Sequence, residues 1–236
     1  MNIMVIIPVS TDKWDASVEA EYNRIKNPET CIRLIHLDRG PEAIQSEYDE
    51  ARAAAWTLTE VAHALDEGVH GVIIYCFSDP GLYGAREIST VPIVGIGESS
   101  QLIAMSLADR IGILTTLPQS VPRIRRKVQA RGFLSRFSSI RALNIPVLEY
   151  DQKEKVVQRA FDVVRVMVDC DDVECLILGC GALIGMEKRL EEAFGIPVVE
   201  PGAAALKYLE MLCSLTLSQS KRSYMVPIPV TTRGDY

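Results

Sequence analysis

The sequence predicts an α/β protein built from two similar lobes, each a parallel sheet flanked by helices, with a shared cleft between them. Two observations predict this fold class. Short runs rich in Val and Ile alternate with longer amphipathic stretches along the 236 residues, and the order of these segments repeats once. Nearly continuous apolar strands are typical of a sheet covered on both faces. Regular alternation of strands with helices is typical of a doubly wound arrangement.

Each predicted strand is a short apolar run that ends at a turn signal. In chain order, these runs lie at residues 3–9, 32–37, 71–76, 92–96, 110–115, 140–148, 175–179 and 196–199. The segments between them carry apolar residues at helical spacing, and they lie at residues 15–26, 45–68, 80–89, 99–108, 119–131, 153–169, 185–194 and 202–217. Gly68, Gly132 and Gly195 follow three of these helices, in the position of a left-handed C-cap.

The internal repeat divides the chain into two lobes. Three pairs of segments resemble each other in order: IMVIIPVS with IGILTTLPQS, GVIIYCFSDPGL with ECLILGCGALIG, and STVPIVGIGE with FGIPVVEPGA. We therefore predict two lobes related by pseudo-twofold symmetry, residues 1–98 with a returning segment 206–236, and residues 99–205. Because ligands bind beyond the carboxyl ends of parallel strands, the active site is expected in the cleft between the lobes.

Composition and charge exclude several classes of function. The chain is 48% apolar and 24% charged, with a net charge of −6, so it has no broad basic surface for nucleic acid or an anionic membrane. The basic residues Arg123, Arg125, Arg126, Lys127 and Arg131 read as a solvated helix face. No run reaches the ~18–20 apolar residues of a membrane span. The first residues do not read as a signal peptide, and we expect a cytoplasmic protein.

Two cysteines occupy matching places in the repeat. Cys76 and Cys180 each end an apolar strand and come just before a predicted helix, which at Cys76 would be capped by Asp79. The helix dipole and the free N–H groups there would lower the pKa of a thiol. A thiolate of near-neutral pKa is a suitable general base for an activated C–H bond, and the opposing thiol is a suitable acid.

Motifs for metals and nucleotides are missing. Cys170, Cys175 and Cys180 do not have the spacing of a CxxC metal site. The segment 95–98, GIGE, lacks the third glycine of a dinucleotide fingerprint, and no phosphate-binding loop or GxSxG serine motif occurs. We therefore predict neither a metal nor a nucleotide cofactor.

Four segments resemble the hydantoin and allantoin racemases, within the Asp/Glu racemase-like group. They are CFSDPGL at 76–82, PIVGIGE at 92–98, LGCG at 178–181 and LSQSKR at 217–222. The resemblance implies two Rossmann-like lobes, catalytic Cys76 and Cys180 on opposite faces of a substrate stereocentre, and no cofactor. It also implies a small-molecule substrate and a homo-oligomer.

The resemblance also predicts the substrate-binding residues. Backbone N–H groups around Ser78, Asp79, Gly181 and Ala182 are expected to hold the ring carbonyl groups. Phe77 is a candidate for the pocket wall, and Thr115 or Thr116 is expected to hydrogen-bond the substrate.

Two positions depart from the family pattern. The first strand runs into Ile7-Pro8-Val9-Ser10 instead of Asn-Pro-Asn-Thr, and Val9 cannot hydrogen-bond a carboxylate or ureido group. The second cysteine motif, residues 180–183, reads Cys-Gly-Ala-Leu instead of Cys-Ala-Gly-Met.

The sequence thus predicts a cofactor-independent racemase of a 5-substituted hydantoin or related cyclic ureide, acting through two cysteines. Three alternatives stay open: a racemase of free aspartate or glutamate or an isomerase of a small diacid, a two-lobed module that binds a ligand without chemistry, and a cysteine hydrolase.

Overall fold

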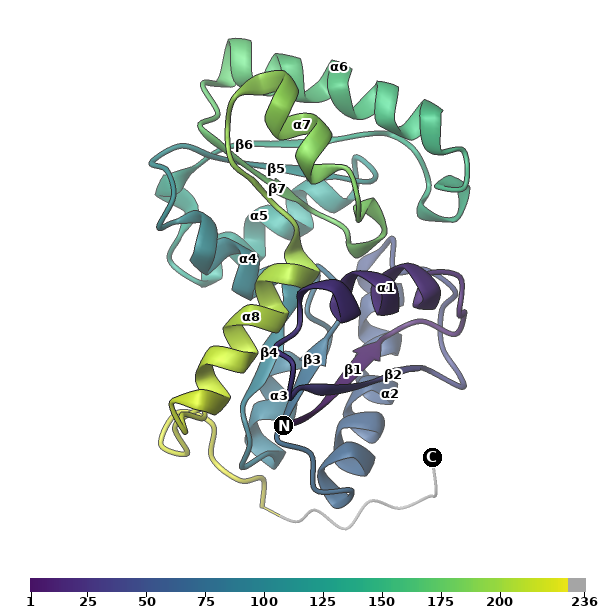
Figure 1. Cartoon of the computed structure of the whole chain (residues 1–236), viewed down its shortest axis with the longest axis vertical. Helices are drawn as coiled ribbons and strands as arrows, with labels where there is room; N and C mark the ends of the chain where they lie inside the picture. The colour runs from purple at the N-terminus through teal and green to yellow at the C-terminus, as the bar shows by residue number, and fades with distance from the viewer. Residues whose placement is uncertain (229–236) are drawn as a thin grey trace.

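The computed structural model describes residues 1–228 and contains two parallel four-stranded sheets, one in each lobe (Figure 1). The first sheet has the order β2 (Cys31–His36), β1 (Asn2–Ile7), β3 (Gly71–Ile74) and β4 (Ile93–Gly95). The second has the order β6 (Phe137–Ala142), β5 (Ile111–Thr115), β7 (Cys175–Leu178) and β8 (Val198–Val199). The identical strand order confirms the predicted fold class of two similar lobes.

Helices cover both faces of each sheet, which explains why the inner strands β1, β3, β5 and β7 are almost wholly buried, whereas the edge strands β2 and β6 also carry exposed polar side chains. In the first lobe these are α1 (Asp15–Ile25), α2 (Glu47–Asp66) and α3 (Leu82–Ile88). In the second they are α5 (Ser120–Ala130), α6 (Lys153–Asp171), α7 (Glu187–Phe194) and the short 3-10 helices η1 (Leu134–Arg136), η2 (Val147–Glu149) and η3 (Gly181–Leu183). No helix within residues 1–228 is long and apolar enough to cross a membrane.

Two helices lie where the lobes join. α4 (Ile96–Ala104) follows the last strand of the first sheet and contacts β7 and β8 of the second sheet. α8 (Pro201–Ser214) leaves the second lobe, returns across the waist of the molecule and packs on α4, α1, β3 and β4 (Figure 1). Ala205, Leu206 and Leu209 of α8 are completely buried in the core of the first lobe.

The segment after α8 covers the edge of the first sheet. The side-chain amide of Gln219 accepts from the N–H of Ile93 and donates to its carbonyl, so the edge strand β4 is paired at this point. Lys221 donates to the carbonyl oxygens of Arg86 and Glu87 at the end of α3. A sheet edge capped in this way has no free backbone groups there to pair with another chain. The last part of the predicted returning segment, residues 229–236, lies outside the described residues.

Several predicted boundaries were wrong. The strand expected at 140–148 is β6, which begins at Phe137 and ends at Ala142; Asn144 then has a positive φ of 60° and Pro146 lacks an N–H, so the chain leaves the sheet. The helix expected at 80–89 begins at Leu82 with Gly81 as its N-cap residue. The helix expected at 99–108 begins at Ile96. The last two shifts share a cause, the side chain of Asp79, described below.

The strand order of the two sheets determines where a ligand-binding site is expected. In both sheets the second strand of the lobe is added on one side of the first strand, and the third is added on its other side. The boundary between the first and third strands is the switch point where open α/β sheets bind ligands. The residues just beyond β1 and β3 therefore meet those just beyond β5 and β7. Both cysteines that the sequence singles out, Cys76 and Cys180, lie at these switch points.

A buried carboxylate begins α8. Glu200 is the N-cap residue, and its two carboxylate oxygens accept from the N–H groups of Gly202 and Ala203. Burial raises the pKa of Glu200 to about 7, although these two hydrogen bonds oppose the shift. The folded protein therefore keeps a proton on Glu200 at a pH where the unfolded chain has lost it.

We expect Glu200→Gln to change how stability depends on pH. In the wild type the free energy of unfolding should fall as pH rises from about 4.5 to about 7, because the unfolded state releases the Glu200 proton first. The amide stays neutral and still offers an acceptor oxygen to the cap. The variant should lack this contribution, which amounts to ~3 kcal/mol. Urea unfolding of both proteins across this range measures it, and parallel pH profiles would contradict the assignment.

Candidate active site

A cavity of ≈ 80 Å³ lies between the lobes at the two switch points. Its first-lobe wall consists of Ile7, Pro8, Val9, Trp14, Ala43, Ile44, Tyr75, Cys76, Phe77 and Ser78, and its second-lobe wall of Thr115, Thr116, Ser120, Arg123, Ile124, Val147, Gly179, Cys180, Gly181 and Ala182. All predicted site residues except Asp79 line this cavity. Their roles in binding and catalysis stay predictions.

The loop after β3 wraps around the sulfur of Cys76. The side chain of Cys76 is half-buried, and its Sγ lies 3.3 Å from Ser78 Oγ. The N–H of Asp79 donates to the carbonyl of Cys76 at 2.9 Å, which closes the turn. This N–H is therefore occupied within the loop, whereas Ser78 lies at the cavity.

Asp79 supports the loop from behind. Its carboxylate accepts from the N–H groups of Gly97 and Glu98, both at 2.8 Å, and so caps the N-terminus of α4 instead of its own helix. Arg131 donates to the same carboxylate at 2.6 Å. A Cβ at Gly97 would lie 2.1 Å from the carbonyl oxygen of Phe77. The CFSDPGL and PIVGIGE motifs thus form one packed unit, with glycine required where the two segments touch.

Cys180 is placed by the equivalent strand of the second lobe. It follows β7 at Gly179, whose N–H donates to Leu114 O at 2.7 Å, and it precedes the 3-10 helix η3. The hydroxyl of Tyr75 donates to the carbonyl of Gly181 at 3.3 Å. Since Tyr75 directly precedes Cys76, this contact ties the loop of one cysteine to the loop of the other.

The thiol pKa values differ from the sequence-based expectation. Burial raises the pKa of Cys180 to about 12, opposed by the N–H of Ala182 and increased by the nearby Cys76. Burial also raises the pKa of Cys76, although the hydroxyl and N–H of Ser78 and the charge of Arg123 oppose it. The expected lowering was wrong because enclosure between two lobes outweighs the helix N-terminus. Because Cys76 raises the pKa of Cys180, ionisation of one thiol further disfavours ionisation of the other.

The basic run on α5 is a solvated face only at Arg125 and Arg126; for the other three cations that prediction was wrong. Arg123, Lys127 and Arg131 are spaced one turn apart and point toward the first lobe. Their side chains are 7%, 28% and 7% exposed, against 62% for Arg126. Lys127 donates to the carbonyl of Ser78 and pairs with Glu50 of α2, and Arg131 pairs with Asp79. These roles were not predicted from the sequence, although the four-residue spacing of the three cations indicates one shared helix face.

The two walls of the cavity differ in character. The first-lobe wall is apolar apart from the cysteine loop, with Val9, Trp14 and Ile44 among its residues. The second-lobe wall carries the hydroxyl side chains of Thr115, Thr116 and Ser120 and the guanidinium of Arg123. The residues of this lining, all within the described part of the chain, include no Asp or Glu.

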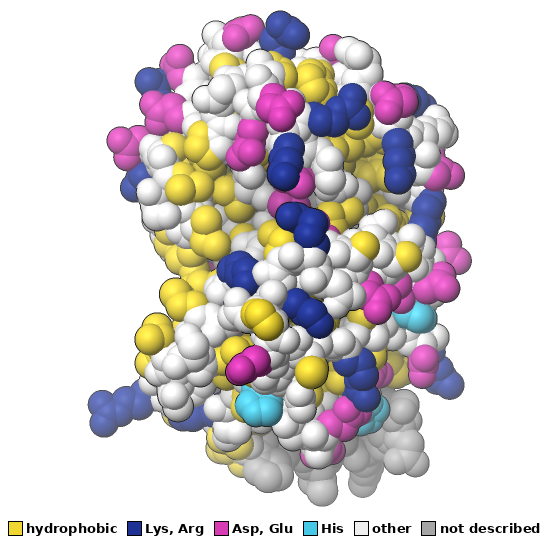
Figure 2. Space-filling view, viewed as in Figure 1, with side chains coloured by type: hydrophobic (Ala, Val, Ile, Leu, Met, Phe, Trp, Pro, Cys, Tyr) yellow, Lys and Arg dark blue, Asp and Glu magenta, His cyan; other side chains and the backbone are white. Residues whose placement is uncertain are grey.

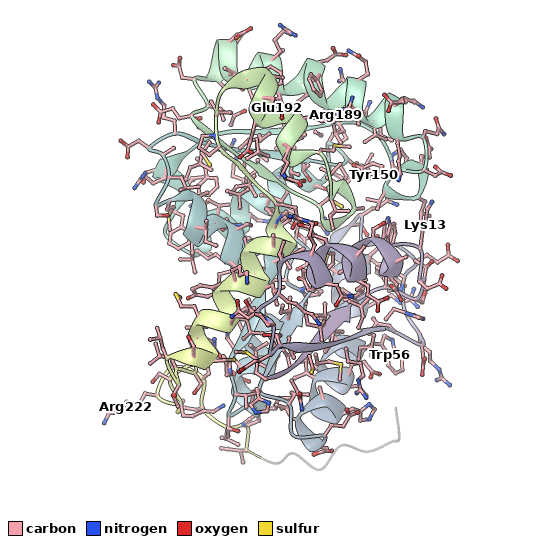
Figure 3. The ribbon with its side chains drawn as sticks, viewed as in Figure 1. Lys13, Trp56, Tyr150, Arg189, Glu192 and Arg222 are labelled. Atoms are coloured by element: carbon pink, nitrogen blue, oxygen red, sulfur yellow. The ribbon has the colours of Figure 1, made fainter. Side chains whose placement is uncertain are left out.

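A second hollow of ≈ 450 Å³ adjoins the first and shares Trp14 and Ala182 with it. Lys13 of the first lobe and Tyr150 and Arg189 of the second lobe line it, on either side of the waist of the molecule (Figure 3). Figure 2 shows Lys and Arg side chains gathered across this waist, where the lobes meet. The wider hollow is thus the more polar of the two. Within residues 1–228, no cluster of three or more His, Cys, Asp or Glu side chains is arranged to hold a metal ion.

The fold and site define a two-lobed α/β enzyme with a thiol from each lobe at one small cavity. Residues 3–209 match the model of the Asp/Glu/Hydantoin racemase family. The chain is 31% identical over 229 residues to a hydantoin racemase of Rhizobium meliloti, covering 96% of this chain and 95% of that protein. The chain therefore belongs to the Asp/Glu/hydantoin racemase family and is an isomerase.

Two solved structures are similar over the whole chain. The allantoin racemase from Pseudomonas fluorescens has a TM-score of 0.94 at 28% identity, over 99% of this chain and all of that one. The allantoin racemase from Klebsiella pneumoniae has a TM-score of 0.91 at 30% identity, over 99% of this chain and 96% of that one.

The raised thiol pKa values predict how the empty site reacts with iodoacetamide. Because the thiolate is the nucleophile, labelling of Cys76 and Cys180 should be slow at pH 7 and rise only above pH ~9, Cys180 later than Cys76. Mass spectrometry of each peptide measures the two rates, with the exposed Cys170 as the internal reference for reagent access. Half-maximal labelling of both site thiols below pH ~8.5 would contradict the burial argument.

Proposed function

We propose that this protein is a cofactor-independent racemase of a 5-substituted hydantoin or a related cyclic ureide, with Cys76 and Cys180 as its two bases. The observation that carries the proposal is that the two thiols end equivalent strands of opposite lobes and line one cavity. The similarity to hydantoin and allantoin racemases supports the same class of substrate.

The chemistry needs one thiolate and one thiol. The C5–H bond of a hydantoin lies beside a ring carbonyl, so loss of the proton delocalises charge onto that oxygen as an enolate. One thiolate takes the proton from one face, and the opposite thiol gives its proton to the other face. The first sulfur ends as a thiol and the second as a thiolate, so the reverse reaction begins from the product state. Two bases are required because a single base tends to return its proton to the same face.

The surroundings of the two thiols are unequal, so one thiol is easier to ionise than the other. Cys76 has the Ser78 hydroxyl, the Ser78 N–H and the charge of Arg123 to stabilise its thiolate. Cys180 has the N–H of Ala182 and a pKa raised to about 12. Of the two thiols, Cys76 is therefore the easier to deprotonate, and we infer that it acts first as the base with Cys180 as the acid.

The walls of the cavity favour a cyclic ureide over a free amino acid. An amino acid brings an ammonium group, and the described residues of the lining offer no carboxylate to face it. A hydantoin ring is neutral, with carbonyl groups for the donors of Thr115, Thr116, Ser120 and Arg123. Its 5-substituent would then lie against the apolar first-lobe wall, where Val9 replaces the family's asparagine. We infer a substrate with an apolar 5-substituent. A homo-oligomer and a cytoplasmic location stay predictions.

Exchange in D₂O tests both the substrate class and the two-cysteine mechanism. Wild-type protein should racemise an enantiopure 5-alkylhydantoin and replace its C5 hydrogen by deuterium, and should leave aspartate and glutamate unchanged. Cys76→Ala and Cys180→Ala should each lose racemisation by ~10²–10⁴-fold, because each removes one proton-transfer group. The Ser variants should retain slow exchange of one enantiomer. Proton NMR and chiral chromatography measure the two outcomes.

Cys31→Ser is the matched control, since Cys31 is exposed and remote from the lining. It should behave as the wild type. Full racemisation by either alanine variant would exclude the two-base mechanism, and exchange confined to aspartate or glutamate would exclude the cyclic ureide.

A further inference from the structure

Arg123 combines deep burial with a place in the lining of the thiol cavity. It lies in the first turn of α5, its side chain is 7% exposed, and it is the one cation of the described lining. Its charge lies close enough to both Cys76 and Cys180 to favour their thiolates. Lys127 and Arg131, further along the same face, lie outside the lining.

The hydrogen bonds of Arg123 leave Nε without a partner and give Nη2 a single long one. Nη1 donates to Ser46 O at 3.0 Å and reaches Glu50 Oε2 at 3.4 Å. Nη2 makes a long contact of 3.4 Å with Ser120 Oγ. Nε is buried and has no partner among the described residues. Nε and Nη2 form the planar fork that matches two lone pairs of an oxygen ligand. Arg123 lines the cavity, and buried donors normally have partners, so its unpaired Nε points to a ligand as the partner.

The charges around Arg123 leave an excess of positive charge at the cavity. Glu50 of α2 pairs with both Arg123 and Lys127, so one carboxylate is shared between two cations. Lys127 also binds the carbonyl of Ser78 in the cysteine loop. This cluster is therefore suited to a transient negative charge at the cavity, where low polarity strengthens the attraction.

We propose that Arg123 is a substrate-binding residue whose Nε–Nη2 edge donates to the ring oxygen next to the reacting carbon, the oxygen that becomes negative when that carbon loses its proton. This proposal rests on the proposed function and adds to it the residue that stabilises the enolate. During turnover the negative charge passes from one sulfur to the substrate oxygen and then to the other sulfur. Arg123 lies near both sulfurs and the cavity between them, so one fixed cation serves all three positions.

The test compares Arg123→Lys and Arg123→Gln with Arg126→Gln, an exposed arginine of the same helix. The Lys variant keeps a positive charge beside Glu50 but lacks the fork. It should lose ~10²-fold in kcat with a smaller change in KM, as expected for a donor that acts on charge developing in the transition state. The Gln variant should lose more, and Arg126→Gln should retain wild-type kinetics. Circular dichroism and melting temperature establish that each variant is folded.

Binding of barbiturate gives a readout that does not depend on turnover. This planar cyclic ureide is an anion at neutral pH and resembles the enolate, whereas unsubstituted hydantoin is neutral. Arg123→Lys should weaken barbiturate binding at least tenfold and hydantoin binding by much less. In the wild type, the Nε–H resonance of Arg123 should shift when barbiturate is added. That measurement needs no variant, so it applies even if a substitution prevents folding.

The outcomes separate this proposal from the proposed function. An Nε–H resonance unmoved by saturating barbiturate, or a folded Lys variant with kcat and barbiturate affinity within threefold of the wild type, overturns the role of Arg123. A wild-type protein that exchanges no hydantoin overturns the proposed function, and the barbiturate experiments still decide whether Arg123 binds an anionic cyclic ureide.

Discussion

The relative position of the two thiols depends on how one aromatic ring packs between the lobes. Tyr75 lies between β3 and Cys76, and its ring is enclosed by Gly181 and Gly202 of the second lobe. A Cβ at these glycines would lie 2.4 and 2.6 Å from the ring. The ring also packs edge-on against Tyr22, whose hydroxyl donates to the carbonyl of Gly202. Any larger side chain at either glycine would displace the ring, and with it one cysteine loop relative to the other.

This close packing has an electrostatic consequence. Both sulfurs are largely enclosed, so the neutral thiol is favoured and a second thiolate beside a first is disfavoured. Cys76 raises the pKa of Cys180, so the state with both thiols ionised is the least favoured one. The same low polarity makes the few donors at the cavity effective, because hydrogen bonds to an anion strengthen where water is scarce. Enclosure between the lobes thus both disfavours a second thiolate and strengthens hydrogen bonds to a single anion.

The cysteine loop is held by groups distant in the sequence. Asp79 caps α4, and Arg131 at the end of α5 donates to the carboxylate of Asp79. Lys127 of α5 donates to the carbonyl of Ser78. Because α4 follows the last strand of the first sheet and α5 belongs to the second lobe, the loop of Cys76 is positioned from both sides of the cleft. A site placed on rigid elements in this way keeps its geometry better than one on a free loop.

The amino-acid sequence was enough to predict the strand and helix order, the repeat, and the position of Cys76 and Cys180 at the carboxyl ends of equivalent strands. These features are local or periodic, and in parallel sheets a strand-end position fixes the neighbourhood of a residue. The direction of the thiol pKa shifts, the capping of α4 by Asp79 and the position of Arg123 at the cavity could be learned only from the folded structure. Each of these depends on what the opposite lobe or a distant helix brings near. Desolvation and long-range pairing are properties of the assembled fold, and no local pattern in the chain records them.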